Sequence, residues 1–471
     1  MSFEVAGVAA LLIGLYALRR PPEMCLILVL VSTMFGTAAA MNLPALGGSS
    51  ILVANFIAIF MMLRLFLYGG PATFVQPLTR DAAGIALLVF AAYALFSAYF
   101  FPRYFVGVTD TVSIATASTG VKIISFQPLF PKPQNITQSA YLVGGVATYC
   151  CVHSYFAVNN SFSALFRGLF LLVTLHLLAT VADVMTYYSG TAELLDPIRN
   201  ANYAYQTGVE KMGLKRLTAF FSEASAFAGY TLIMFAFTFS LWLDRIRTGV
   251  TGRLSLGLFV GLVLSTSGSG YVALCVVYLL MMTFKVFRPS SGNGFNHASI
   301  FMMVTIVAMA AAILTLLYIP GQLETFRNFA DDTVFGKLES SSGQERSLWN
   351  TTAYQNFLDT DGFGAGLGSA RASSLFLVLL SNLGVIGTLL FLIWLGLILF
   401  TRVDASLGHE RVAAVAAMRW SLVATLIIAT LAKTDFDFGL LFYILAGAVA
   451  ASLARQPERF GERVQPTGRI G

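Results

Sequence analysis

The sequence has little charge, few cysteines and few histidines. Charged residues make up 11% of the 471 residues, against 57% hydrophobic residues, and there are four cysteines and four histidines. This composition excludes a water-soluble domain and favours a membrane protein. All four cysteines fall inside apolar runs, which predicts small buried side chains and neither a disulfide framework nor a metal site. They are Cys25, Cys150, Cys151 and Cys275.

Long apolar runs take the place of charge. A helix of roughly 20 apolar residues crosses a hydrocarbon core about 30 Å thick. Thirteen runs meet or approach this length, so we predict an all-α polytopic membrane protein with 12 to 13 transmembrane helices in a single domain, 1–471. The expected spans are 2–18, 24–41, 51–68, 82–101, 140–158, 164–187, 218–243, 254–265, 268–284, 299–319, 375–400, 412–431 and 438–454.

The stretch 254–284 decides the orientation, because it forms either one long tilted helix or two short helices. Cytoplasmic loops collect Lys and Arg, and Arg253 and Lys285 stand at its two ends, which predicts two helices with an outer turn. The N-terminus is then outside, with an uncleaved first span, and the C-terminus is cytoplasmic. The cations expected in the cytoplasm are Arg19, Arg20, Arg80, Arg245, Arg247, Arg253, Lys285, Arg288, Arg402, Arg411, Arg455, Arg459, Arg463 and Arg469.

Three long loops, 102–139, 188–217 and 320–374, lie on the outer side in this topology. The first contains several prolines and is predicted to be an irregular cover on the outer face. The other two concentrate cations. These cations are Arg199, Lys211, Lys215 and Arg216 in the second loop, and Arg327, Lys337, Arg346 and Arg371 in the third.

The second loop leads into a span that carries Glu223. We expect Arg216 and Glu223 to share one helix face, with the carboxylate about 10 Å deeper than the cation. An ionised group at that depth is costly unless it is paired or functional. Glu223 is therefore either a functional group or one partner of a structural salt bridge.

The third loop contains GFGAGLGS followed by Arg371, just before the span 375–400. Backbone N–H groups of a Gly-rich turn and of a helix start point at anions, and an arginine beside them adds a planar fork for phosphate oxygens. The glycines alone equally suit a turn or close helix packing. Two cation-rich loops on one side favour a lipid-linked pyrophosphate at the outer face.

Two other acidic features, the Asp435-Phe-Asp437 turn and Asp183, could be functional or structural. Asp435-Phe-Asp437 resembles the metal-binding Asp-x-Asp pair of nucleotide-sugar transferases, but it stands in a short outer turn. Asp183 lies near the outer end of its span, where it could pair with a cation of an outer loop.

Three stretches resemble one known family. They are RLTAFFSEASAFAGY (Arg216–Tyr230), LVLSTSGSGYVAL (Leu262–Leu274) and SGQERSLWNTTAYQNFLDTDGFGAGLGSARASSLFLVLLSNLGVIG (Ser342–Gly387). They are similar to bacterial O-antigen polymerases and ligases, which are multi-helix glycosyltransferases of the inner membrane. The family pattern of an arginine, a nearby tryptophan, a Gly-rich turn and an apolar helix corresponds here to Arg346, Trp349, Gly362–Gly368 and Leu379–Gly387.

The resemblance implies a fold similar to that of the GT-C glycosyltransferases, and transfer of a glycan from undecaprenyl pyrophosphate to an acceptor hydroxyl in the periplasm. Neither a nucleotide sugar nor a metal is expected. Arg216 and Arg346 would hold the pyrophosphate during catalysis, and Arg371 would be a further clamp. Arg199 and Lys215 would add to the pyrophosphate site. Glu223 would be the general base.

Within this family a ligase is expected to use a periplasmic histidine after the Gly-rich turn. Here His297 and His409 fall in predicted cytoplasmic loops, while His153 and His176 lie in spans. The residues therefore favour a polymerase that joins lipid-linked repeat units into a surface polysaccharide. A ligase acting on lipid A core and a lipid-linked oligosaccharide flippase or exporter are the alternatives.

The expected partners of such a polymerase are the lipid-linked oligosaccharide and the bilayer, together with a chain-length regulator and a flippase of the same pathway. Nucleic acid is not expected to bind.

Overall fold

The computed structural model describes residues 2–43, 49–116, 122–159, 162–211, 213–287, 297–318, 341–404 and 408–454, together with single positions between 321 and 331 and at 406. Several predicted cations lie outside the described residues. These are Arg288, Lys337, Arg455, Arg459, Arg463 and Arg469.

A helix lies at each of the thirteen expected spans. In chain order they are α1 (Val5–Leu18), α2 (Pro22–Ser32), α3 (Val53–Gly69), α5 (Ala82–Tyr104), α6 (Pro133–Val158), α7 (Ser163–Tyr188), α8 (Ala224–Leu243), α9 (Thr248–Leu264), α10 (Gly268–Val286), α11 (His297–Tyr318), α14 (Leu375–Phe400), α15 (His409–Ala432) and α16 (Leu440–Leu453). The predicted division of 254–284 into two helices is confirmed, and the Ser267 side chain caps α10 by accepting the N–H of Gly270. The span predicted at 24–41 is wrong in its second half, because α2 ends at Ser32 and Ala39–Leu43 forms a strand.

The helices differ in whether they are long enough to cross a membrane. Among the described residues seven are both long and apolar enough: α5, α6, α7, α8, α10, α14 and α15. Helix α3 and the short helix α4 (Ala72–Thr79) form an eighth candidate that is bent by 92°. Helices α1, α2, α9 and α16 are apolar but shorter. The chain is therefore a multi-pass membrane protein.

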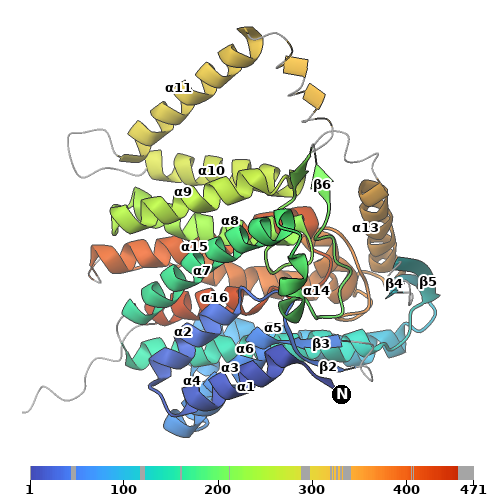
Figure 1. Ribbon diagram of the computed structural model, residues 1–471. Coiled ribbons are helices and arrows are strands. Elements are labelled where there is room, and N and C mark those ends of the chain that lie inside the picture. Colours follow the sequence, from blue (N-terminus) through green and yellow to red (C-terminus); the bar gives the residue numbers. More distant parts are fainter. Residues whose placement is uncertain are drawn as a thin grey trace, which may run out of the picture.

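Three small antiparallel sheets lie at one end of the helix bundle, which we call the hairpin end (Figure 1). Strands β1 (Ser2–Phe3), β2 (Ala39–Leu43) and β3 (Ser49–Leu52) form the first sheet, β4 (Asp110–Thr116) and β5 (Lys122–Pro128) the second, and β6 (Glu210–Lys211) and β7 (Leu214–Lys215) the third. The expectation of an irregular loop at 102–139 is wrong, because β4 and β5 pair there over seven residues each.

Hydrogen bonds at the hairpin end tie the third predicted outer loop to the first, and the second to the N-terminal sheet. The Asn356 amide on α13 (Ser341–Asp359) donates to the Asp110 carbonyl at 2.6 Å, which ties the third loop to the first. The Ala39 N–H donates to the Asn200 side chain at 2.8 Å, which ties the second loop to the sheet beside the N-terminus. These loops therefore share one end of the bundle, as the predicted topology requires.

The opposite end of the bundle carries a separate set of ion pairs. Lys285 contacts Asp244, and the Arg247 guanidinium lies 3.3 Å from the Glu410 carboxylate. Residues predicted to be cytoplasmic thus gather away from the hairpin end. Two further pairs, Glu23 with Arg167 and Asp81 with His153, lie among the same helix ends.

Glycines allow α6 and α16 to pack closely. A Cβ atom at Gly447 would lie 2.7 Å from the Tyr149 carbonyl oxygen, and one at Gly145 would lie 2.3 Å from the Tyr443 ring. Small residues that let backbones approach are typical of helix contacts inside membranes. This contact holds α16, and the turn before it, against the start of α6.

We expect Gly447→Val to destabilise the protein by about 1–3 kcal/mol, because overpacking a tight helix contact forces the backbones apart. Thermal unfolding of the detergent-solubilised protein measures the effect. Gly396→Val is the matched control, since a Cβ atom at that position meets nothing within 4 Å. Equal melting temperatures for the two variants would contradict the close contact between α6 and α16.

Candidate anion-binding site

The second loop approaches α8 as irregular backbone. Arg216 follows strand β7, and Glu223 is the N-cap of α8 with extended backbone angles (φ −152°, ψ 161°). The prediction that Arg216 and Glu223 share a helix face is therefore wrong, because the helix starts only at Ala224. The two side chains nevertheless interact. Burial lowers the pKa of Arg216, and the nearby Glu223 carboxylate acts in the opposite direction.

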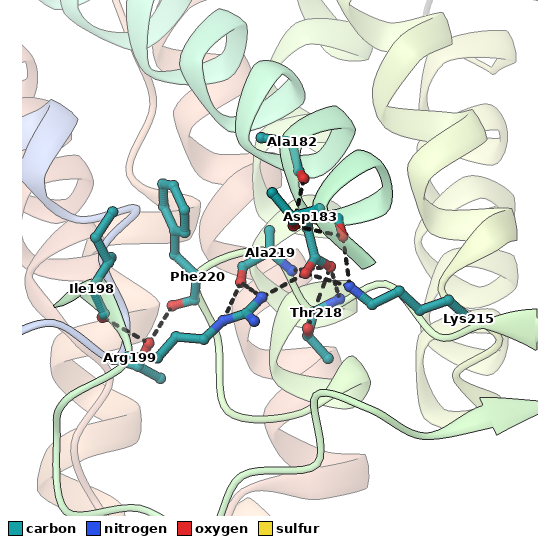
Figure 2. Close-up of polar contacts among 10 residues, drawn as sticks. Ala182, Asp183, Ile198, Arg199, Lys215, Thr218, Ala219 and Phe220 are labelled. Atoms are coloured by element: carbon teal, nitrogen blue, oxygen red, sulfur yellow. Dashed lines mark hydrogen bonds and ion pairs between the residues drawn. The ribbon is translucent and has the colours of Figure 1, made fainter. Parts of the chain in front are cut away.

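The same loop is fastened to the bundle by Asp183, a buried carboxylate near the end of α7. Figure 2 shows Arg199 and Lys215 converging on it from two sides of the loop. Arg199 donates to Asp183 at 2.5 Å, and Lys215 contacts the same oxygen. The other oxygen accepts the backbone N–H groups of Thr218 at 3.2 Å and Ala219 at 3.0 Å.

This triad gives Arg199 and Lys215 a different role from the one predicted. Their side chains are only 7% and 3% exposed, and Asp183 is fully buried. Arg199 also donates to the Ala219 carbonyl at 2.6 Å, so its fork is committed to the protein. Burial lowers the pKa of Lys215, and the Asp183 carboxylate opposes this shift. We therefore assign both cations to holding the loop and not to binding pyrophosphate.

We expect Asp183→Asn to destabilise the loop by about 3–5 kcal/mol, because two buried cations would lose their shared counter-ion. Limited trypsin digestion reads this out as faster cleavage after Lys211 and Arg216. Asp196→Asn is the matched control in the same loop, where the side chain is exposed. If Asp183→Asn resisted trypsin as well as the control variant does, the triad would not be what holds the loop.

The Gly-rich turn of the third loop has a backbone that other residues cannot readily adopt. Gly362, Gly364, Gly366 and Gly368 all have positive φ, between 79° and 94°. A Cβ atom at Gly366 would lie 2.6 Å from the Ser97 carbonyl oxygen on α5, and one at Gly364 would lie 2.6 Å from the Gly384 nitrogen on α14. The glycines thus combine turn geometry with close packing against two helices.

Two asparagines fix the end of this turn. The Asn382 side chain accepts the N–H groups of Gly368 at 3.0 Å and Ala370 at 3.1 Å, and it donates to the Ala370 carbonyl at 2.9 Å. The Asn135 amide donates to the Leu367 carbonyl at 2.7 Å and to the Ser369 hydroxyl at 2.8 Å. The turn is therefore held rigidly in front of α14.

Arg371 follows the turn, three residues before the N-cap Ser374 of α14. Its guanidinium lies over the Trp349 ring of α13, 4.6 Å from the ring centroid, which is within cation–π range. Its Nε is buried and has no hydrogen-bond partner in the described part of the chain. Burial lowers the pKa of Arg371, and the carboxylates of Asp435, Glu345 and Glu223 oppose that shift.

The carboxylates around Arg371 show which elements meet here. Glu345 belongs to α13, Glu223 to the start of α8 and Asp435 to the turn before α16. None of them makes an ion pair of 4 Å or less with Arg371 among the described residues. The Glu223 carboxylate opposes the lowering of the pKa of both Arg216 and Arg371. The Arg216 Nε is likewise buried without a partner among these residues.

Arg346 is half-buried on α13, three residues before Trp349. Residues three apart are neighbours on a helix surface, so Arg346 lies on the α13 face that carries the ring under Arg371. The predicted cations therefore divide into two groups. Arg371 contacts Trp349 and Arg346 lies on the same face of α13, while Arg216 and Arg371 both feel the Glu223 carboxylate. Arg199 and Lys215 belong to the Asp183 triad.

A cavity of about 150 Å³ opens beside Arg371. Arg371 and Asp435 line it, while Arg216, Glu223 and Arg346 do not. Three further lining residues, Lys132, Gln138 and Asn382, were missed by the sequence analysis. Asn382 could have been predicted from the sequence, because it is a polar amide inside an apolar membrane run. Lys132 and Gln138 could not, since they become neighbours of Arg371 only through the tertiary fold.

The Asp-x-Asp turn is organised by a lysine and by backbone contacts. Lys433 lies 3.3 Å from the Asp435 carboxylate and contacts the Asp437 carbonyl. The Asp437 side chain accepts the Gly439 N–H at 2.8 Å, at the start of α16. Among the described residues no group of three or more His, Cys, Asp or Glu side chains is arranged to hold a metal. Lys433 and the start of α16 thus each contact one oxygen of this pair of carboxylates.

The described histidine side chains lie away from the hairpin end or inside the bundle. His153 faces Asp81 at 3.3 Å and His409 faces the Asp244 carbonyl at 3.0 Å, both among the opposite set of helix ends. His176 is buried against Thr231 at 2.9 Å. None of the three interacts with Arg371 or Arg216.

Models of known protein families and curated protein sequences give no match to this chain. The likeness to O-antigen polymerases and ligases therefore rests on the stretches quoted for it.

Proposed function

We propose that this protein is a glycosyltransferase that polymerises undecaprenyl-pyrophosphate-linked oligosaccharide repeat units into a surface polysaccharide. The main support for this proposal comes from Arg216 and Arg371. The Nε atoms of both side chains are buried and have no hydrogen-bond partner among the described residues. A buried donor without a partner is costly, so an unmet donor in a folded site favours a ligand that satisfies it. A pyrophosphate supplies the acceptor oxygens and the negative charge.

The proposed transfer uses the hairpin end as its reaction site. The acceptor hydroxyl oxygen bonds to the anomeric carbon of the donor sugar as that carbon's bond to the pyrophosphate oxygen breaks. The hydroxyl proton passes to a carboxylate, and the departing pyrophosphate keeps the electron pair of the broken bond. Arg216 and Arg371, with Arg346 beside them, offset the charge that develops on the leaving group.

Glu223 is the proposed general base. Its carboxylate acts electrostatically on both Arg216 and Arg371, and the Ser225 hydroxyl donates a hydrogen bond to it. Placement at the helix start, and not deep inside a span, leaves it able to reach an acceptor that enters from water. A base close to the clamp can take the proton without a separate conformational step.

The proposed orientation follows from the distribution of cations. The hairpin end would face the periplasm of a bacterial inner membrane, with the N-terminus there and the C-terminus in the cytoplasm. A lipid-linked donor suits this side, because its isoprenoid tail stays in the bilayer while its head reaches the arginines. The periplasmic partners would include a chain-length regulator, and a flippase would supply the repeat units.

The arrangement favours transfer over transport. The charged side chains described above gather near the two ends of the bundle, and the Arg216 and Arg371 Nε atoms that lack a partner among the described residues both lie at the hairpin end. A flippase requires polar groups along a route between the two faces. A ligase would require a base other than histidine, since none of the described histidines interacts with these arginines.

We expect Arg371→Met to reduce polymerisation by about 10²–10³-fold, because one preorganised donor to the leaving group is lost. The assay follows a glycan ladder made by purified protein in lipid from undecaprenyl pyrophosphate-linked repeat units. Arg253→Met is the matched control, since that side chain is exposed and donates to the Gly249 carbonyl at the opposite end. Activity is expected to survive a chelator.

If Arg371→Met made the same glycan ladder as wild type, Arg371 would not belong to the reaction site. If wild type bound the substrate but made no ladder, the polymerase proposal would be contradicted, and the ligase or the flippase would be favoured.

A further inference from the structure

The cavity beside Arg371 has a chemistry that differs from a phosphate site. It is bounded by strand β4, the first turn of α6, the end of the Gly-rich turn and the Asp-x-Asp turn. Its lining brings two cations, Arg371 and Lys132, together with the Asp435 carboxylate and three amides, those of Gln134, Gln138 and Asn382. Lys132 already donates to the Thr111 hydroxyl. The proposed function uses only the arginine and leaves the rest of this lining unexplained.

Two buried polar atoms belonging to the lining are unsatisfied within the described part of the chain. One is the Arg371 Nε, a donor, and the other is the Gln138 Oε1, an acceptor. Buried polar atoms in folded proteins are nearly always paired, so each unpaired atom calls for an explanation. An inorganic anion that filled the cavity would be repelled by the amide oxygen and by the Asp435 carboxylate. A sugar hydroxyl instead donates to the Gln138 oxygen, and the Arg371 Nε stays available to the pyrophosphate of the proposed function.

The carboxylate in the lining has an oxygen available for such a ligand. Both contacts of Asp435 use Oδ1, which lies 3.3 Å from the Lys433 ammonium and accepts the Asp437 N–H at 3.2 Å. Oδ2 makes no contact among the described residues and can accept a hydrogen bond from a ligand hydroxyl. The Asn382 side chain is already hydrogen bonded to the Gly-rich turn, so it lines the cavity without offering a group to the ligand.

The size of the cavity limits the ligand. A volume of about 150 Å³ suits a ligand the size of a single sugar ring. One sugar at a time would be bound here, and the remaining sugars would lie in solvent.

We propose that this cavity is a binding subsite for the hydroxyl groups of one sugar, held by Asp435 and Gln138 and bordered by Arg371. The inference rests on the proposed function for the sugar's identity as part of a donor or acceptor. Asp435 and Gln138 fix which sugar is accepted, because a site built around hydroxyls rejects analogues that lack them. Arg371 joins this subsite to the pyrophosphate clamp.

The test uses purified protein in nanodiscs and two kinds of probe. Methyl glycosides of hexoses, N-acetylhexosamines, deoxyhexoses and uronic acids report on the subsite, and geranyl pyrophosphate reports on the clamp. Binding of each is followed by saturation-transfer NMR for wild type and for Gln138→Met, Asp435→Asn and Arg216→Met. Gln355→Met and Asp359→Asn are matched controls, since these two residues form an exposed pair on α13.

We expect at least one glycoside to bind wild type, and Gln138→Met and Asp435→Asn to weaken it about tenfold each, as loss of one hydrogen bond predicts. Both variants should bind geranyl pyrophosphate within about twofold of wild type. Arg216→Met should weaken the binding of geranyl pyrophosphate and leave the binding of the glycoside unchanged. Gln138→Met should also melt at or above the wild-type temperature, because it removes an unpaired buried acceptor.

The outcomes separate the two proposals. If wild type binds geranyl pyrophosphate but no glycoside, the sugar subsite is overturned and the clamp stands. If a glycoside binds and depends on Asp435 while geranyl pyrophosphate does not bind, the subsite stands and the proposed function loses its donor. Glycoside binding that is unchanged by both cavity variants would place the sugar elsewhere and overturn the assignment.

Discussion

The hairpin end depends on one buried ion cluster, in which Asp183 holds Arg199 and Lys215. A carboxylate in the outer part of a membrane helix is costly unless it is paired. Here it accepts from two cations and two backbone N–H groups, so each partner offsets part of its desolvation. The loop between α7 and α8 is therefore fixed at its middle and at its end. Arg216 and Glu223 take their positions from that attachment.

The site then combines a rigid frame with polar groups that the protein does not satisfy. Asn382 and Asn135 hold the Gly-rich turn, and Trp349 lies under the Arg371 guanidinium. Rigid placement of donors before a ligand arrives is what makes them effective on a charge that develops during reaction. The same frame leaves Arg371 and Gln138 with buried polar atoms that lack a partner among the described residues, which is consistent with binding at this end.

The sequence predicted the membrane class and a helix at each apolar run, because apolar runs of about 20 residues are dictated by bilayer thickness. It did not predict which helices fall short of a full crossing, as α1, α2, α9 and α16 do. It also predicted a partner for Asp183 among the cations of the outer loops. The predicted placement of Glu223 within a helix was wrong. The backbone is irregular beyond Arg216, so α8 begins only after Glu223. It assigned Arg199 and Lys215 to a ligand, since a free cation and a buried partner of Asp183 look the same in a sequence. Gln138 and Lys132 could not be found, because only the tertiary fold brings α6 to Arg371.

The proposed function requires Arg216 and Arg371 at the hairpin end to hold a pyrophosphate. An electron cryomicroscopy structure of the protein in nanodiscs with geranyl pyrophosphate would show whether they do. We expect diphosphate density within hydrogen-bond distance of both Arg371 and Arg216, with Glu223 beside it and the isoprenoid chain leaving toward the bilayer. Diphosphate density at the opposite end of the bundle, or at the hairpin end without contact to either arginine, would contradict it.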